Sequence, residues 1–295
     1  MVFSLVEGSS QGKPSPSACL GKRRHSGYTT PMSSPDLRGV LHAQAAEAVF
    51  QVLRHEPGPE LAPWVEHLWE LHYQVPPGQV HTQRVLSFPN VHLAFEDEDE
   101  RRALVYGVPG QPFTRELRGA GRVLGVRFRA GGFWGFWRKP VSDLTAKVVP
   151  AQEVWGPGVD EVLSSVFRDQ SIDREPVSRF LAALNPIREP DAELAGQAVD
   201  KALRDPSLIR VEDYAAALGL GVRQLQRLFQ RYVGVSPKWV LRRFRLQEAA
   251  QALDHDPAVS WTDLALQLGY FDQAHFVNDF KAVLGVTPGD YRRGS

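Results

Sequence analysis

Six side chains between residues 66 and 92 have types that bind metal ions: Glu66, His67, Glu70, His72, His81 and His92. A metal-binding barrel places two histidines on alternate residues of one strand, followed by a spaced carboxylate. The sequence lacks that spacing, and His67 and His72, five residues apart, do not share a helix face well. We therefore expect ordinary surface or half-buried histidines and no metal site.

The single cysteine, Cys19, lies in a polar N-terminal stretch, so this chain alone cannot build a disulfide or a cysteine zinc site. A thiol in such a stretch has nothing beside it that would activate it as a nucleophile. The sequence also lacks a glycine-rich phosphate loop that contains a lysine. We predict no catalytic residue, no cofactor and no enzymatic activity.

A cluster of large aromatic side chains follows three small residues, Ala130–Gly132. Aromatic walls supply most of the burial in apolar ligand pockets, but they also form protein cores and subunit contacts. Pocket, core and subunit contact therefore remain open as alternatives. The candidates for an effector pocket are Phe133, Trp134, Phe136 and Trp137.

The charges are unevenly distributed, although the 295 residues carry a net charge of zero. Residues 210–247 contain eight basic and two acidic residues, a net charge of +6, and residues 248–295 contain three basic and seven acidic residues, a net charge of −4. Phosphate attraction depends on clustered lysine and arginine rather than on the total. The 210–247 segment is therefore the better candidate for gripping nucleic acid.

Three segments of the C-terminal part occur twice. Asp213–Gly219 matches Asp263–Gly269, Leu225–Phe229 matches Phe276–Phe280, and Gly234–Pro237 matches Gly285–Pro288. Three of their landmarks, Phe229, Gly234 and Pro237, recur 51 residues later. Three aligned landmarks indicate a true internal repeat.

Each copy has the pattern of two helices joined by a tight turn. Ala215 and Ala265 are small where a first helix must approach a second, and Gly219 and Gly269 end that first helix. On the second helix Leu225 and Phe229, like Phe276 and Phe280, are four residues apart and face the core. Ser236-Pro237 and Thr287-Pro288 begin the next helix as N-cap and first residue. The pattern predicts a helix-turn-helix in each copy.

With these motifs, residues 206–295 resemble the AraC/XylS family of bacterial transcription regulators. The second copy follows the family signature almost throughout, from Gly269 to Arg292. One departure is Asn278, where the family often has arginine, and this implies a weaker grip by the second copy. A fainter resemblance, through Pro63–Trp69 and Gly125–Phe128, is to an uncharacterised domain that precedes the same DNA-binding unit. Relatives of this type have a β-rich sensing or dimerisation domain there.

The outer face of the second helix of a helix-turn-helix enters the major groove and reads base edges. With the apolar positions assigned to the core, we expect Arg223, Gln226 and Arg227 on that face in the first copy. In the second copy the outward residues are expected to be Gln273, Ala274, His275, Val277 and Asn278. The family resemblance implies the same positions, and the alternative is a solvated face that contacts only phosphate. The predicted base-reading residues are Arg223, Gln226, Arg227, Gln273, Ala274, His275 and Asn278.

A long helix from Pro237 to about Leu253 is expected to join the two copies. It would hold two recognition helices about 34 Å apart, one DNA turn, so that one chain reads successive major-groove segments. Arg245 is expected either among the basic residues on DNA or in an internal ion pair. The predicted phosphate contacts are Lys238, Arg242, Arg243 and Lys281.

Short apolar runs separated by turn residues predict β-strands in the N-terminal part. The runs are 49–53, 84–88, 91–95, 103–106 and 122–128, with one helix expected at Leu61–Tyr73. Residues 1–46, rich in Ser, Gly and Pro, are expected to be a disordered tail, and Met32 is an alternative start to Met1. We predict an α+β chain with four parts. They are the tail (1–46), a β-rich barrel-like domain (47–156), a helical connector that could pair with a second copy (157–192), and a DNA-binding domain (193–295) with helix-turn-helix units at about 211–234 and 261–285.

The sequence as a whole predicts a cytoplasmic, sequence-specific regulator of transcription. Its expected partners are double-stranded DNA, RNA polymerase, a small-molecule effector at the N-terminal domain and a second copy of the chain. No apolar run approaches the roughly 18 residues of a membrane span, and we expect no membrane contact. The alternative is an enzyme with a catalytic N-terminal barrel and a C-terminal half that tethers it to DNA. A third interpretation makes the N-terminal domain a dimerisation module only.

Overall fold

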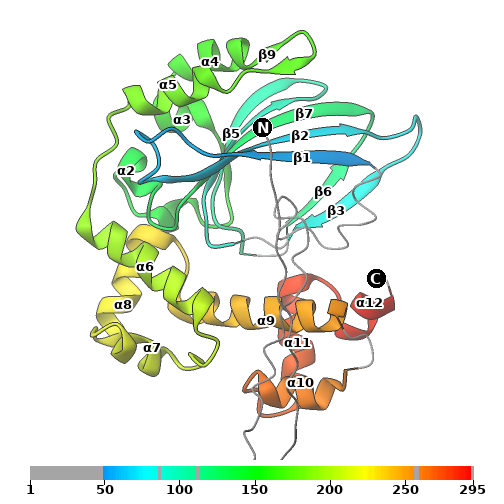
Figure 1. The fold of residues 1–295 in the computed structure, drawn as a ribbon, viewed down its shortest axis with the longest axis vertical. Helices are drawn as coiled ribbons and strands as arrows, with labels where there is room; N and C mark the ends of the chain where they lie inside the picture. The colour runs from blue at the N-terminus through cyan, green and yellow to red at the C-terminus, as the bar shows by residue number, and fades with distance from the viewer. Residues whose placement is uncertain (1–48, 86–87, 111–112, 256–258, 294–295) are drawn as a thin grey trace, which may run out of the picture. The chain divides into compact units, whose positions relative to one another are not determined.

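The N-terminal part is built around a six-stranded antiparallel sheet (Figure 1). The structure, a computed structural model, describes residues 49–85, 88–110, 113–255 and 259–293. The predicted tail at 1–46, Cys19 and Met32 therefore lie outside the described residues. In order across the sheet, the strands are β1 (Phe50–His55), β2 (Val65–Gln74), β7 (Ala120–Phe128), β4 (His92–Asp97), β5 (Arg101–Tyr106) and β8 (Val148–Pro150).

The β-rich prediction is confirmed, but the sheet of the described residues is not a closed barrel. Its edges are β1 and the three-residue β8, which do not pair with each other. Two further strands, β3 (His81–Val85) and β6 (Phe113–Leu117), form a separate antiparallel ribbon. The predicted strands at 49–53, 91–95, 103–106 and 122–128 match β1, β4, β5 and β7.

The helix predicted at Leu61–Tyr73 is wrong, because most of this segment is strand β2, paired with β1 on one side and β7 on the other. A bulge between Val65 and His67 shifts the register. As a result the buried Val65 and Leu68 lie three residues apart, which imitates helical spacing on an extended strand. The residues before the strand form turns, in which Leu61 N–H donates to the Gly58 carbonyl at 2.9 Å.

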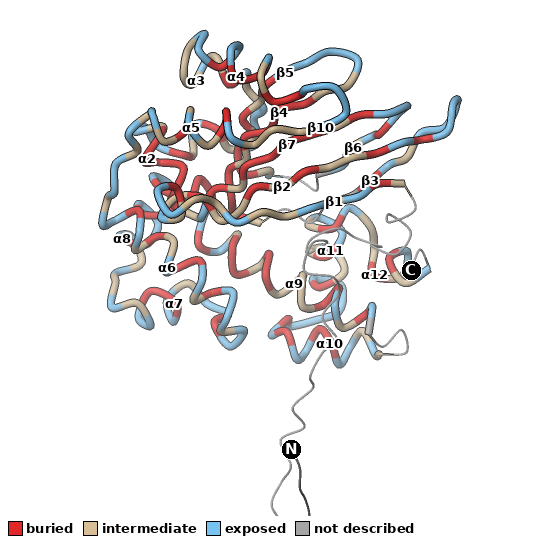
Figure 2. Tube along the Cα trace, turned by 45° about the horizontal axis from the view of Figure 1, so that its top comes forward, coloured by how far each residue is buried: buried red, intermediate tan, exposed pale blue. Residues whose placement is uncertain are grey.

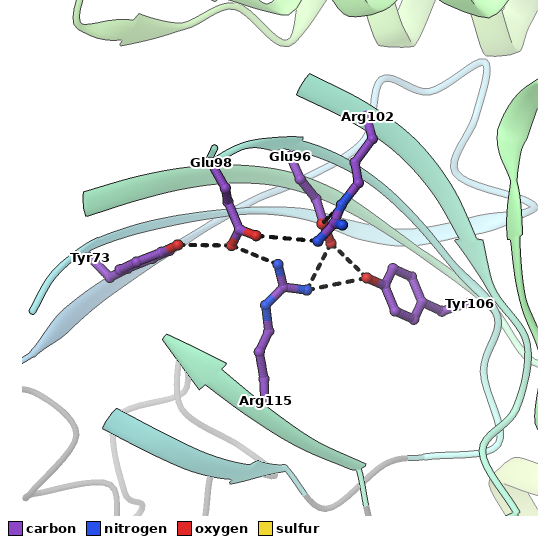
Figure 3. A network of polar contacts seen from close by, with 6 residues as sticks. All are labelled: Tyr73, Glu96, Glu98, Arg102, Tyr106 and Arg115. Atoms are coloured by element: carbon purple, nitrogen blue, oxygen red, sulfur yellow. Dashed lines mark hydrogen bonds and ion pairs between the residues drawn. The ribbon is translucent and has the colours of Figure 1, made fainter. Parts of the chain in front are cut away.

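A network of polar side chains lies between the six-stranded sheet and the β3–β6 ribbon (Figure 3). Arg115 of β6 donates to Glu96 at 2.8 Å and to Glu98 at 2.7 Å. Tyr106 and Arg102 donate to Glu96 at 2.6 and 2.8 Å, and Tyr73 donates to Glu98 at 2.8 Å. The Glu96 side chain is fully buried. Because a buried carboxylate needs such partners, this network ties the ribbon to the sheet.

Short helices cover the sheet after β7 and lead into the connector. They are α2 (Trp134–Trp137), η2 (Val141–Leu144), α3 (Ala151–Trp155), α4 (Gly158–Val166) and α5 (Glu175–Ala183), with a small hairpin of β9 (Phe167–Arg168) and β10 (Ser171–Ile172) between the last two. The buried faces of α4 and α5 belong to the same core as the sheet. Helix α6 (Pro190–Arg204) begins at a proline and runs across the predicted boundary between residues 192 and 193.

The remaining helices form two similar triplets around one long helix. The first comprises α7 (Val211–Ala217), α8 (Val222–Leu228) and the π-helical turn η3 (Phe229–Val233). The long helix is α9 (Pro237–His255), and the second triplet is α10 (Trp261–Gln267), α11 (Gln273–Leu284) and α12 (Pro288–Arg293). Figure 1 shows α7 and α8 near one end of α9 and α10 to α12 near the other.

Helix α9 changes its core along its length. Its first half contributes Val240 and Phe244 to a core that also contains the sheet and the first helix-turn-helix, whereas Leu246 and Leu253 belong to the core of the second. Figure 2 shows buried stretches along β2, β7 and α9. The first unit therefore packs as one body with the sheet domain, and the second has a core of its own.

Candidate nucleic-acid interface

The first helix-turn-helix is held by a tight turn and a buried seam between α7 and α8. Gly219 adopts φ +69° at the end of α7, and Ala215 is 1% exposed where the helices approach. The seam consists of Leu225 and Leu228 of α8 and Phe229 at the start of η3, all buried. This packing fixes which face of α8 points outward.

The outward face of α8 carries the residues predicted to read bases. Arg223, Gln226 and Arg227 are all exposed. A guanidinium can donate two hydrogen bonds to guanine, and a glutamine amide can pair with adenine. The sequence prediction of this face agrees with the burial of α8, and the contacts with DNA stay a prediction.

The second unit repeats the arrangement with better caps. Ser260 caps α10 by accepting from Asp263 N–H, and Asp272 caps α11 by accepting from His275 N–H at 2.7 Å. Phe276 and Phe280 are buried, with ring centroids 5.6 Å apart. The exposed residues of α11 include the four predicted base readers, Gln273, Ala274, His275 and Asn278. Val277, expected to point outward, is half-buried and packs against the core of the second unit, three residues before the buried Phe280.

The predicted phosphate contacts fall into three groups. Lys238 and Lys281 are exposed. Arg242 is half-buried and forms an ion pair with Asp279 at 3.3 Å. Arg243 is 3% exposed, and burial lowers its pKa to about 9. The structure corrects the prediction for Arg243, because its side chain is packed inside the protein, next to the buried Phe244, and does not present its charge to phosphate.

Asp279 organises the second unit, and the sequence analysis did not single it out. Its carboxylate accepts from Arg242 of α9 at 3.3 Å and from the Tyr270 hydroxyl of the turn at 3.2 Å, and His275 Nε2 lies 3.8 Å away. Arg245 donates to the Leu268 carbonyl at 3.2 Å, an internal contact rather than the expected ion pair. The Arg242–Asp279 pair attaches the recognition helix α11 to α9, and the Tyr270 bond attaches the turn to α11. The sequence signal was the polar residue at position 279, one residue before the buried Phe280.

The first unit is docked on the sheet domain through its π-helical turn. Trp134 of α2 packs edge-to-face on Tyr232, with ring centroids 5.3 Å apart. The Thr145 hydroxyl donates to the Gly234 carbonyl at 2.5 Å. Gly234 adopts φ +95°, a conformation that favours glycine, and a Cβ added there would lie 3.1 Å from the Val141 side chain, a tight contact. These contacts join the sheet domain directly to the first unit, so a structural change at Trp134 or Thr145 would act on that unit.

The four aromatic residues proposed for an effector pocket pack into the core or against it. Phe133, Trp134 and Phe136 are buried, and Trp137 packs against them. A cavity of about 660 Å³ lies beside them, lined by the sheet domain, α6 and α9. Its lining includes Trp64, Gly132 and Gly135 from the sheet domain and Gln247 from α9, but none of the four aromatic residues. Whether those four contact an effector stays a prediction.

The histidines of the sheet domain lie on strands and are engaged by neighbours. His55 and His72 lie 3.0 and 3.7 Å from Glu70, and His81 lies 3.2 Å from Gln83. Burial, with Arg127 nearby, lowers the pKa of His67 and of His92 to about 3, so both are neutral at pH 7. Among the residues that the structure describes, no three His, Cys, Asp or Glu side chains form a group that could hold a metal ion.

Comparison with known protein families gives two matches, separated by residues 151–213. Residues 214–294 match a helix-turn-helix domain, and residues 53–150 match a domain of unknown function, DUF6597. The first match spans α7 to α12 and includes every predicted base reader. The C-terminal part is an AraC-type helix-turn-helix domain. Within the described ranges, no helix is long and apolar enough to cross a membrane.

Curated relatives of this AraC-type domain are transcriptional regulators. The regulator MtrA of Neisseria gonorrhoeae is 35% identical over 83 residues, which are 28% of this chain and 27% of MtrA. The regulator GbdR of Pseudomonas aeruginosa is 26% identical over 133 residues, 45% of this chain and 34% of GbdR. The activator AarP of Providencia stuartii is 34% identical over 84 residues, 28% of this chain and 62% of AarP. The chain thus spans about a third or less of the first two relatives.

Comparison with solved structures gives matches of low TM-score, two of which are AraT and ToxT. The C-terminal domain of AraT, a response regulator from Geobacillus stearothermophilus, has a TM-score of 0.32 and 26% identity, covering 36% of this chain and 87% of that one. ToxT from Vibrio cholerae has a TM-score of 0.37 and 12% identity, covering 83% of this chain and 98% of ToxT.

Proposed function

We propose that the protein is a sequence-specific regulator of transcription that inserts α8 and α11 into successive major-groove segments of a promoter. The observation that carries the proposal is that both helices bury their apolar seams while their polar side chains stay exposed. A face of this kind can exchange water for base edges without exposing a core. The basic segment 210–247, with its net charge of +6, supplies the phosphate attraction.

The N-terminal domain is proposed to regulate this binding through an effector. The cavity of about 660 Å³ touches both the sheet domain and α9, the helix that sets the spacing of the two units. A ligand that prefers one arrangement of these elements shifts the population that is competent to bind DNA. RNA polymerase and a second copy of the chain are further partners in this proposal. The enzyme alternative has no support, because the curated relatives are transcriptional regulators.

Selection of bound fragments from genomic DNA with the purified full-length chain tests the proposal. It is run at a stated physiological salt concentration, because phosphate contacts alone give salt-sensitive binding without sequence preference. Enrichment of one motif supports a sequence-specific regulator. Recovery of random fragments only, both with and without cell extract as a source of effector, would contradict it.

A further inference from the structure

The turn before the second recognition helix is one residue longer than the turn before the first. Leu220 N–H donates to the Ala215 carbonyl, and Tyr270 N–H donates to the Ala265 carbonyl, both at 2.9 Å. These two equivalent bonds are 50 residues apart. The N-caps that follow, Gly221 and Asp272, are 51 residues apart. Phe271 is therefore the additional residue, with no counterpart in the first unit.

Phe271 is also the most exposed large apolar side chain among the described residues, at 94%. Tyr270 already fills the structural role of the turn, since it is buried and packs on Phe276 with ring centroids 5.4 Å apart. In the first unit the equivalent Leu220 packs against the core. The additional ring thus contributes no packing to its own unit and leaves a large apolar surface in water.

The position of Phe271 places it beside the face that reads DNA. It immediately precedes Asp272, the N-cap of α11, and the N-terminal residues of a recognition helix are those that reach base edges. The apolar group that the major groove offers is the 5-methyl group of thymine, which phenylalanine can contact. The neighbouring Asp272 carboxylate is occupied by the His275 N–H.

We propose that Phe271 is a specificity-determining residue that packs on a thymine methyl group within the segment read by the second unit. The proposal rests on the proposed function. It makes the longer turn the means by which the second unit gains selectivity, because residues 248–295, to which this unit belongs, carry a net charge of −4. Direct apolar contact with one methyl group replaces some of the electrostatic grip that this unit lacks.

The test uses the full-length chain and a duplex recovered by selection from a random-sequence library. Each thymine of the selected motif is replaced in turn by uracil, which removes only the methyl group. We expect one replacement, in the half of the motif read by the second unit, to weaken wild-type binding about fourfold. This is the loss of affinity that corresponds to one methyl group that is no longer buried. Phe271→Ala should bind thymine and uracil duplexes equally, and Phe271→Leu should keep part of the preference.

Leu266→Ala is the matched control, because Leu266 is 61% exposed on α10 of the same unit. It should discriminate thymine from uracil as the wild type does. If wild type and Phe271→Ala respond identically at every thymine, the inference is wrong while the proposed function stands. Phe271→Ala could also fail to activate transcription by purified RNA polymerase and still bind the uracil duplex more weakly than the thymine duplex. The ring would then contact a protein, and the inference would also be wrong. If no motif is selected at all, both proposals fail.

Discussion

At the residue scale, the exposed arginines of α8 are the strongest candidates for direct readout. Arg223 and Arg227 project from a helix whose other face is packed, so their position relative to the groove is set by the fold. Within the part of the chain that the structure describes, neither forms an ion pair that would have to be broken, in contrast to Arg242, which is bonded to Asp279. Direct readout by the first unit is therefore expected to depend on these few side chains.

Arg227→Ala should weaken binding to the selected site by about 1–3 kcal/mol and narrow the gap between specific and random DNA. The reason is the loss of two hydrogen bonds from the guanidinium to guanine. Random DNA does not offer a guanine at that position in every sequence, so its binding weakens less. Fluorescence anisotropy with both duplexes measures it. Arg179→Ala, exposed on α5, is the control and should leave both affinities unchanged. Equal loss on both duplexes would reassign Arg227 to phosphate.

Lys238 and Lys281 are expected to contact phosphate without reading bases. Each alanine substitution should weaken binding to specific and random DNA alike and reduce the slope of log K against log salt by about 1. Affinities measured over a salt series give the slope. Lys139→Ala, exposed on the sheet domain, should keep the wild-type slope. An unchanged slope for both lysine variants would remove them from the interface.

The Glu96 network makes the sheet domain sensitive to acid. Burial alone would raise the pKa of Glu96, but hydrogen bonds from Arg115, Tyr106 and Arg102 outweigh it and hold the pKa below its ordinary value. A carboxylate with a lowered pKa stabilises the fold above its unfolded-state pKa of 4.5, and this stability is lost as the pH falls through the folded-state pKa.

Glu96→Gln should cost about 3 kcal/mol at pH 7, because the half-buried Arg115 then keeps only Glu98 as a charge partner. The variant should also lose stability less steeply than the wild type as the pH falls below about 4.5. Urea unfolding monitored by tryptophan fluorescence across a pH series measures both effects. Parallel pH profiles for the two proteins would exclude this carboxylate as a source of acid sensitivity.

At the element scale, the repeat predicted more of the structure than the local patterns did. The helix-turn-helix boundaries, the capping residues Ser236 and Thr287 and the long α9 were all predictable, because glycine, proline and capping residues recur in both copies. Strand β2 was not, because the bulge after Val65 gives its buried residues helical spacing. The burial of Arg243 was not predictable either. Helix α9 is packed on more than one side, and an arginine in the sequence predicts an exposed position.

The one-residue difference between the turns was visible in the sequence. The first pair of matching segments is offset by 50 residues and the later landmarks by 51. Only the structure shows that the additional residue is Phe271 rather than Tyr270, because the repeated backbone bond from residue 270 to Ala265 assigns the pair. Tertiary bonds such as Arg242 to Asp279 have no comparable local signal.

The two cores predict different stabilities for the two units. Phe280 is fully buried in the core of the second unit, and its replacement by alanine should destabilise that unit by about 3–5 kcal/mol. Hydrogen exchange should then speed up in residues 259–293 while the sheet keeps its protection. Trp134→Ala should show the reverse pattern, affecting the sheet and α7 to η3. Uniform acceleration in both variants would contradict two separate cores.

At the scale of the whole molecule, the sheet domain, the first unit and the first half of α9 pack as one body, and the second unit is attached through α9. A ligand in the cavity beside α9 would act on the spacing and orientation of the two recognition helices together. Regulation would then change how well the spacing and orientation of α8 and α11 fit two successive major-groove segments, and thereby the affinity for DNA. It requires no rearrangement within either helix-turn-helix.

The central claim is that each helix-turn-helix unit reads its own DNA segment. The most direct test is to repeat the DNA selection with variants that lack the predicted base-reading side chains of one unit at a time. The Gln226→Ala/Arg227→Ala chain should relax only one half of the motif, and Gln273→Ala/His275→Ala only the other, with the halves separated by about one turn of DNA. That result would establish two readers in one chain. Loss of preference in the same half by both variants, or across the whole motif by either, would contradict the central claim that each unit reads its own segment.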